Sequence, residues 1–119
     1  MSAARRRRAE RSGRLAESIS AWWLKLHGYR VLERRLRSPA GEIDILARRG
    51  RTLAVVEVKA RRDWDAAVES VSRRQRQRIG RAAAAYLARN PGLEGLEVRF
   101  DVMLVVPWRP PRHIMDAWR

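Results

Sequence analysis

The chain has 119 residues, no cysteine and a formal net charge of +14 at pH 7, which fits one domain with a single core and excludes disulfides and thiolate metal sites. No apolar run approaches the roughly 20 residues that span a bilayer, and no signal-peptide segment follows the N-terminal arginines, so we expect a cytoplasmic protein with no membrane partner. The charge predicts an anionic partner, and nucleic acid matches it best.

The N-terminal part of the chain predicts a tail followed by a helix. Residues 1–11 contain four consecutive arginines, Arg5 to Arg8, and we expect a disordered basic tail there. Ser12 can begin a helix that Gly28 ends. Its apolar residues recur at helical spacing and predict a stripe that packs on the core: Leu15, Ile19, Trp22, Trp23 and Leu26.

The remaining elements predict an α/β protein. Four apolar stretches predict strands, at residues 29–35, 42–47, 53–60 and 96–106. Ser70 or Ser72 can cap a second helix that stops at Asn90-Pro91-Gly92. The prolines after the last strand predict a tail without regular structure over residues 107–119. The order αβββαβ in a domain of residues 12–106 indicates an α/β sandwich with a mixed central sheet.

Four charged side chains interrupt two strands that are otherwise apolar: Glu42, Asp44, Glu57 and Lys59. A carboxylate that is buried without a partner costs several kcal/mol, so these charges require a reason. Side chains in a strand alternate between its two faces. Glu42 and Asp44 therefore share one face of their strand, and Glu57 and Lys59 share one face of the next.

The turn between these strands decides whether the two faces coincide. Gly50 can adopt positive φ, so the hairpin loop is either Gly50-Arg51 or Arg49-Gly50. The first loop places Asp44 directly opposite Glu57, and the second places Glu42 there. Both registers put the four charged side chains on one face.

Carboxylates that converge in this way repel each other unless a proton, a cationic side chain or a divalent cation lies between them. Lys59 supplies part of the compensation. Mg²⁺ supplies more, because it favours one or two protein carboxylates together with waters and substrate phosphate oxygens. A metal there can activate a bound water and neutralise charge on a phosphate.

These residues carry a family resemblance. Gly41-Glu42-Ile43-Asp44 followed by Val56-Glu57-Val58-Lys59 resembles the D-(x)n-E-x-K core of the PD-(D/E)XK nuclease superfamily. The longer stretch GEIDILARRGRTLAVVEVKARR, with Gly13 to Glu17 upstream and Arg99 to Val102 downstream, is similar to the bacterial YraN family, also called UPF0102. The resemblance covers about residues 12–106 and implies a restriction-endonuclease-like fold.

The resemblance also implies roles for particular residues. Asp44 and Glu57 would bind the metal, and Lys59 would be the catalytic lysine. Glu17 would be a helix-borne acid that reaches the same site, as in archaeal Holliday junction resolvases. Without the resemblance, Glu17 reads as a surface residue paired with Arg14, three positions earlier on the same helix face.

The second helix begins with basic residues that we expect to hold a nucleic-acid backbone. With the glutamine among them, they are Arg73, Arg74, Gln75, Arg76 and Arg78. Gln75 stands where the YraN family commonly has lysine.

Three further residues have open interpretations. Asp101 could lie near the site or pair with a cation such as Arg99. His113 is too isolated from His27 in the sequence for a metal pair. Trp108 lies in the expected tail, where stacking on bases is compatible with the sequence but not required by it.

We therefore expect an endonuclease dependent on Mg²⁺ or Mn²⁺ that acts on branched or otherwise structured DNA, with DNA rather than RNA as its partner. Glu42 would complete or tune the metal site formed by Asp44 and Glu57. The alternative is a non-catalytic nucleic-acid-binding protein that retains the nuclease fold. An RNA-binding or ribosome-associated module would explain the charge but not the acidic cluster. Symmetrical cleavage of both strands would require a homodimer.

Overall fold

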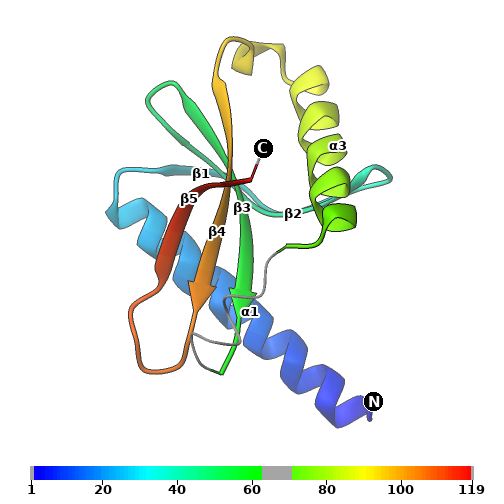
Figure 1. The fold of residues 1–119 in the computed structure, drawn as a ribbon, viewed down its shortest axis with the longest axis vertical. Coiled ribbons are helices and arrows are strands. Elements are labelled where there is room, and N and C mark those ends of the chain that lie inside the picture. Colours follow the sequence, from blue (N-terminus) through cyan, green and yellow to red (C-terminus); the bar gives the residue numbers. More distant parts are fainter. Residues whose placement is uncertain (1, 63–70, 119) are drawn as a thin grey trace.

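The computed structural model describes residues 2–62 and 71–118 (Figure 1). Its elements, in chain order, are α1 (Ala3–Leu26), β1 (Arg30–Ser38), β2 (Gly41–Arg49), β3 (Thr52–Ala60), α3 (Arg73–Arg89), the 3₁₀ helix η1 (Pro91–Leu93), β4 (Glu97–Val105) and β5 (Arg112–Trp118). No described helix is both long and apolar enough to cross a membrane.

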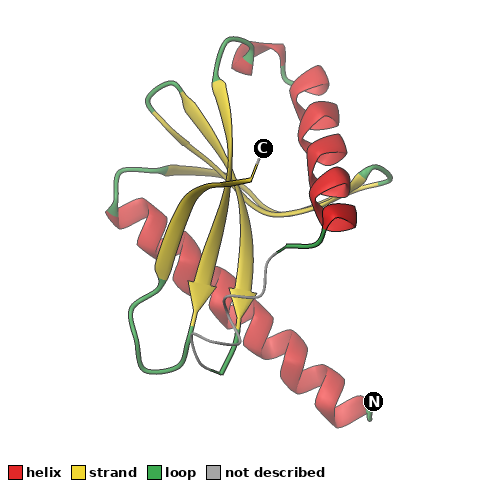
Figure 2. Cartoon of the chain, in the orientation of Figure 1, coloured by secondary structure: helices red, strands yellow, loops and turns green. Residues whose placement is uncertain are grey.

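One sheet contains all five strands, in the order β1-β2-β3-β4-β5 (Figure 2). β3 and β4 are parallel, whereas the other neighbouring pairs are antiparallel. The sheet is therefore mixed, and together with the helices it confirms the predicted α/β class, which is compatible with a restriction-endonuclease-like fold.

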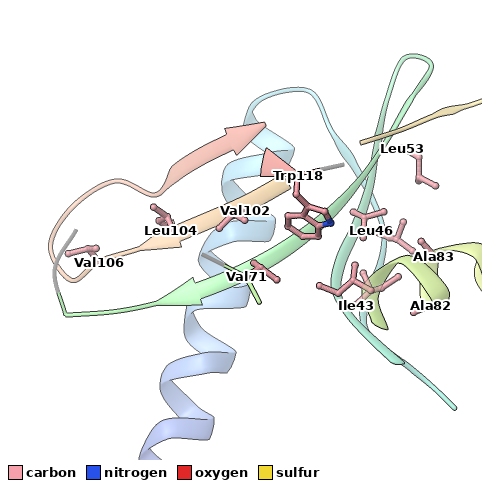
Figure 3. Packing of buried hydrophobic residues seen from close by; sticks show 12 residues of the cluster. Ile43, Leu46, Leu53, Val71, Ala82, Ala83, Val102, Leu104, Val106 and Trp118 are labelled. Atoms are coloured by element: carbon pink, nitrogen blue, oxygen red, sulfur yellow. The ribbon is translucent and has the colours of Figure 1, made fainter. Parts of the chain in front are cut away.

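The core consists of two apolar clusters, one on each face of the sheet. Leu46 and Val55 belong to the cluster that contains residues of α3, shown in Figure 3, whereas Ala47 and Ala54 belong to the cluster that contains residues of α1. Helices thus cover both faces of β2 and β3. This explains why these strands read as nearly continuous apolar runs.

α1 begins earlier than the sequence predicts. Its N-cap is Ser2, whose hydroxyl accepts a hydrogen bond from the Arg5 backbone N–H at 3.2 Å. Arginine and alanine are both good helix formers, so the arginine-rich segment continues the helix. The prediction of a disordered tail over residues 1–11 is therefore wrong for the described part of that segment.

The apolar stripe predicted to face the core is turned outward along much of α1. Leu15, Trp22 and Leu26 are 62%, 60% and 60% exposed. The residues that α1 buries are mostly small: Ala16, Glu17, Ser20, Ala21 and Leu24. Two residues of the predicted stripe, Ile19 and Trp23, are partly buried and still pack against the same cluster as Ala16, Ala21 and Leu24.

The C-terminal segment contains a strand where the sequence predicts none. β5 pairs with β4, and Trp118 is buried, with its ring stacked 5.3 Å from that of Phe100. Three prolines, at positions 107, 110 and 111, lie in the connection before β5. They therefore end β4 without preventing an edge strand after them, as expected for proline outside the sheet ladder.

Gly41 allows β2 to contact α3 closely. Its φ is +152°, and a Cβ at this position would lie 2.7 Å from the Arg78 carbonyl oxygen. We expect Gly41→Ala to lower the free energy of unfolding by about 1–3 kcal/mol, because both the backbone and the helix contact become strained. Urea denaturation would measure this loss.

Gly50→Ala is the matched control for that substitution. Gly50 also has positive φ, +60°, but a Cβ there would have no atom within 4 Å. The control should therefore lose only the backbone preference of glycine, about 1 kcal/mol. Equal losses in the two variants would show that the contact between Gly41 and Arg78 contributes nothing.

Candidate metal centre and nucleic-acid interface

The β2–β3 hairpin places Asp44 next to Glu57. The ladder runs from Arg49 opposite Thr52 to Ile45 opposite Val56, which confirms the Gly50-Arg51 loop. The next residues in this register are Asp44 and Glu57, the first of the two arrangements that the sequence predicts.

The backbone of β3 fixes the carboxylate of Asp44. Its Oδ2 accepts a hydrogen bond from the Val58 N–H at 2.8 Å. The regular pairing of β2 with β3 ends at Ile45, one residue after Asp44 in the chain. Strand alternation is also interrupted here, because Ile43 packs in the cluster on the α3 side and Ile45 in the cluster on the α1 side. The side chain of Asp44 is therefore held in a defined position where the two strands separate.

Glu57 and Lys59 lie on the same face of β3. Lys59 Nζ is 3.6 Å from Glu57 Oε1, and each side chain is only 14% exposed. Glu42 is more exposed and lies 3.9 Å from Arg37, measured from Oε1 to Nε. A cavity of about 120 Å³ is lined by all three acids and by residues of α3: Glu42, Asp44, Glu57, Gln75, Arg78 and Ile79.

Burial raises the pKa of both inner carboxyl groups, and a neighbouring carboxylate adds to each rise, Asp44 in the case of Glu57 and Glu17 in the case of Asp44. Desolvation and then the charge of Asp44 raise the pKa of Glu57 from 4.5 to about 7, and the nearby Lys59 opposes this rise. Desolvation also raises the pKa of Asp44, although the Val58 N–H stabilises its ionised form. The pair therefore has a high affinity for positive charge, either a proton or a cation.

This donor set fits a hard divalent cation held by two protein carboxylates. Among the described residues, no three acidic, histidine or cysteine side chains form a ready-made metal site. Mg²⁺ does not require one, because it commonly combines one or two carboxylates with waters and substrate phosphates. Asp44 and Glu57 supply such a pair.

Glu17 is buried and paired with two arginines of β1. Arg34 Nε lies 3.2 Å from its Oε1, and Arg35 Nε lies 2.9 Å from its Oε2, so Arg14 is not the partner. Consecutive strand residues normally point to opposite faces. Arg35 escapes this alternation because its φ is +52°, and both arginines consequently reach one carboxylate.

Glu17 and Asp44 nevertheless face the same polar cavity, which has a volume of about 460 Å³. Three arginines that the sequence analysis did not assign to the site also line it: Arg14, Arg35 and Arg37. Because the positive φ of Arg35 breaks the strand alternation, no local pattern predicted its place in this cavity. The catalytic role of Glu17 stays a prediction, and its two ion pairs oppose direct contact with a metal.

The N-terminal end of α3 brings part of the predicted backbone-binding set to the acids. Ser72 caps the helix in a capping box with Gln75, whereas Ser70, the alternative cap, lies outside the described residues. Gln75 and Arg78 line the cavity with the acids, and Arg73 and Arg74 are exposed.

Arg76 is placed differently from the other basic residues of α3. Its Nε donates to the Val71 carbonyl oxygen at 2.9 Å, and its guanidinium carbon lies 5.8 Å from the centre of the Trp118 ring. Packing and a local hydrogen bond therefore occupy Arg76.

Asp101 belongs to a separate buried network. Its oxygens accept hydrogen bonds from Arg99, from His113 Nε2 at 2.8 Å and from the Asp116 N–H at 3.0 Å, while Arg99 also donates to the Tyr29 hydroxyl. Of the two interpretations of Asp101, pairing with Arg99 is correct. The sequence did not reveal His113 as a partner because β5 was not predicted.

Comparison with known proteins places the chain in a family. The model of the "Uncharacterised protein family UPF0102" matches residues 16–105. A UPF0102 protein of Paramagnetospirillum magneticum is 56% identical over 115 residues, which cover 93% of this chain and 89% of the relative. A UPF0102 protein of Rhizorhabdus wittichii is 49% identical over 115 residues, 96% of both chains. The chain therefore belongs to the UPF0102 family.

Proposed function

We propose that this protein is a metal-dependent endonuclease that hydrolyses phosphodiester bonds of branched or otherwise structured DNA in the cytoplasm. The observation that carries this proposal is the partly buried group formed by Asp44, Glu57 and Lys59 beside the basic start of α3. A purely structural hairpin would gain no stability from two adjacent carboxyl groups whose pKa values are both raised. Such arrangements are typical of functional sites.

In this proposal, Asp44 and Glu57 hold Mg²⁺ or Mn²⁺, and Glu42 completes or tunes the site from its exposed position. The metal would supply charge neutralisation at the phosphate and a water of lowered pKa. Lys59, whose Nζ lies 3.6 Å from Glu57 Oε1, stabilises the negative charge that develops during attack. Arg78 and Gln75 contact the phosphate backbone from α3, and symmetrical cleavage of both strands would require a homodimer.

A specific observation favours the non-catalytic alternative. Both oxygens of Glu17 are occupied by arginines, so the helix-borne acid that the family resemblance assigns to the site is neutralised. In a protein that only binds nucleic acid, the arginines would hold phosphates and the acids of β2 and β3 would have no catalytic task.

Cleavage assays separate these two functions. Wild type should cleave linear, supercoiled or four-way-junction DNA with Mg²⁺ or Mn²⁺ and not with a chelator. Asp44→Ala and Lys59→Ala should each reduce the rate at least about 100-fold, because each removes an electrostatic contribution to the transition state. Glu94→Gln, a control at an exposed residue in the turn before β4, should retain full activity.

The opposite outcome has an equally clear pattern. If wild type cleaves none of the substrates with either metal, and if both alanine variants bind DNA with unchanged salt dependence, the endonuclease proposal is wrong. The binding function would then account for the charge of the protein.

A further inference from the structure

A groove separate from the acidic cluster lies between α1 and the ends of β3 and β4. Its volume is about 530 Å³, within the range of about 300–1,000 Å³ typical of ligand sites. Apolar residues include Leu15, Ile19 and Val105. Besides apolar residues, the described part of the lining contains three arginines and an exposed tryptophan and no acid: Arg61, Arg62, Arg109 and Trp108.

Trp108 has two properties that packing does not explain. Its relative exposure is 102%, so it contributes nothing to the core. Its φ is +64°, a conformation that is unfavourable for a bulky side chain, in a turn where the Arg109 N–H donates to the Val106 carbonyl. Strain of this kind is concentrated at functional sites, and here it presents a large aromatic surface beside the groove.

We propose that this groove binds an unpaired nucleobase of a nucleic-acid strand, with Trp108 as the stacking surface and Arg61, Arg62 and Arg109 at the flanking phosphates. The chemistry of the lining matches that ligand in both of its parts. A base has an apolar face that stacks on aromatic rings, and its neighbouring phosphates require cations. The inference deepens the proposed function, on which it rests, by naming a substrate that combines duplex with single-stranded nucleotides.

The position of the groove supports this occupant. Val58 and Ala60 lie on the same face of β3, and they line the polar cavity that contains Asp44 and the groove, respectively. Likewise, Arg14 lines the polar cavity that contains Asp44, whereas the next residue, Leu15, lines the groove. One strand can therefore pass from the carboxylates to the groove over adjacent residues of the protein.

A second copy of the chain is a poorer occupant. Each copy carries a net charge of +14, and the three arginines around the groove would face like charges in an equivalent partner. An anionic lipid surface shares the required chemistry, but it does not account for the connection between the groove and the acidic site.

Fluorescence anisotropy of the full chain without divalent metal tests the proposal independently of cleavage. The two probes are a blunt-ended DNA duplex of two separate strands and the same duplex with a short single-stranded overhang. Trp108→Ala should weaken binding of the overhang probe about 10-fold, within the range of one lost stacking contact, and leave binding of the blunt probe unchanged. Trp108→Phe should restore most of the affinity.

Trp22→Ala is the matched control, because Trp22 is also exposed on the surface but does not line the groove. It should bind both probes like wild type. Arg109→Gln should reduce the slope of log K against log salt for the overhang probe by about 0.7, as expected for one lost phosphate contact with a single strand.

Three results would overturn the inference. The first is unchanged overhang binding by Trp108→Ala, and the second is an equal loss on both probes. The third is a Trp108→Ala protein that loses only its binding to phosphatidylserine vesicles, or only its self-association as measured by sedimentation. Failure of the proposed function looks different, because wild type would then cleave no DNA while the difference between the two probes persisted.

Discussion

Glutamine in place of Glu57 should abolish metal-dependent cleavage and should also stabilise the folded protein above pH 7. The two effects have one origin. In the proposed function the carboxylate holds the metal, but it lies next to Asp44 and only 14% of its side chain is exposed. A neutral amide removes the metal ligand and the repulsion together, so activity and stability should change in opposite directions.

The sign of the stability effect follows from the pKa of Glu57. The folded state raises this pKa from 4.5 to about 7, first through burial and then through the charge of Asp44. The protonated group therefore favours folding below pH 4.5, and this contribution is lost as the pH rises to about 7. That interval corresponds to about 3 kcal/mol at about 1.4 kcal/mol per pH unit.

Urea denaturation at pH 4, 6 and 8 would measure the effect. Glu57→Gln should match wild type at pH 4 and exceed its free energy of unfolding by up to about 3 kcal/mol at pH 8. Mg²⁺ should stabilise wild type at pH 8 and not the variant, because in the proposed function only the wild-type folded state binds it. A Glu57→Gln protein that is less stable than wild type at pH 8 would contradict the electrostatic origin of the raised pKa.

Removal of Asp101 should cause the largest loss of stability. Asp101 is completely buried and joins Arg99 and His113 to one carboxylate. Asp101→Ala leaves a mostly buried guanidinium without its anion, which typically costs about 3–5 kcal/mol. This is a large fraction of the roughly 5–15 kcal/mol that stabilises an ordinary domain.

The same network predicts that the free energy of unfolding decreases at acidic pH. Burial raises the pKa of Asp101, but hydrogen bonds from His113, Arg99 and the Asp116 N–H outweigh burial and hold the pKa below its ordinary value of 3.8. Its contribution is therefore present above pH 3.8 and is lost as the pH falls through the lower folded-state pKa.

Denaturation of Asp101→Ala beside Glu97→Ala, an exposed residue at the start of β4, would test this prediction at neutral pH. The control should change stability by less than about 0.5 kcal/mol. A similarly small change in the Asp101 variant would show that the network is not required for folding.

Local chemistry was sufficient to predict the hairpin and its charged face. Gly50 and strand alternation left two registers open, with either Asp44 or Glu42 opposite Glu57, and the β2–β3 ladder has the first of them. Ser72 was one of two predicted caps, and it begins α3 as an N-cap residue should. These features depend on residues close in sequence, whose backbone preferences act before any distant contact forms.

The partners of Glu17 and the second partner of Asp101 could not be predicted in the same way. Glu17 meets Arg34 and Arg35 only because β1 folds beside α1 and Arg35 adopts positive φ. His113 reaches Asp101 only because β5 adds to the edge of the sheet. Such pairs depend on which segments become neighbours, and no local pattern encodes that.

The sequence by itself determined the mixed α/β class, the position of a two-residue β2–β3 turn at Gly50 and the charged residues beside it, and the structure chose between the two possible loops. The tertiary structure decided which side of α1 is buried: Leu15, Trp22 and Leu26 of the predicted stripe are exposed, whereas Ala16, Ser20 and Leu24 are buried. It also decided that Glu17 is held by arginines and that Trp108 remains exposed beside a groove. Periodicity describes one segment, whereas burial depends on the surfaces that two segments share.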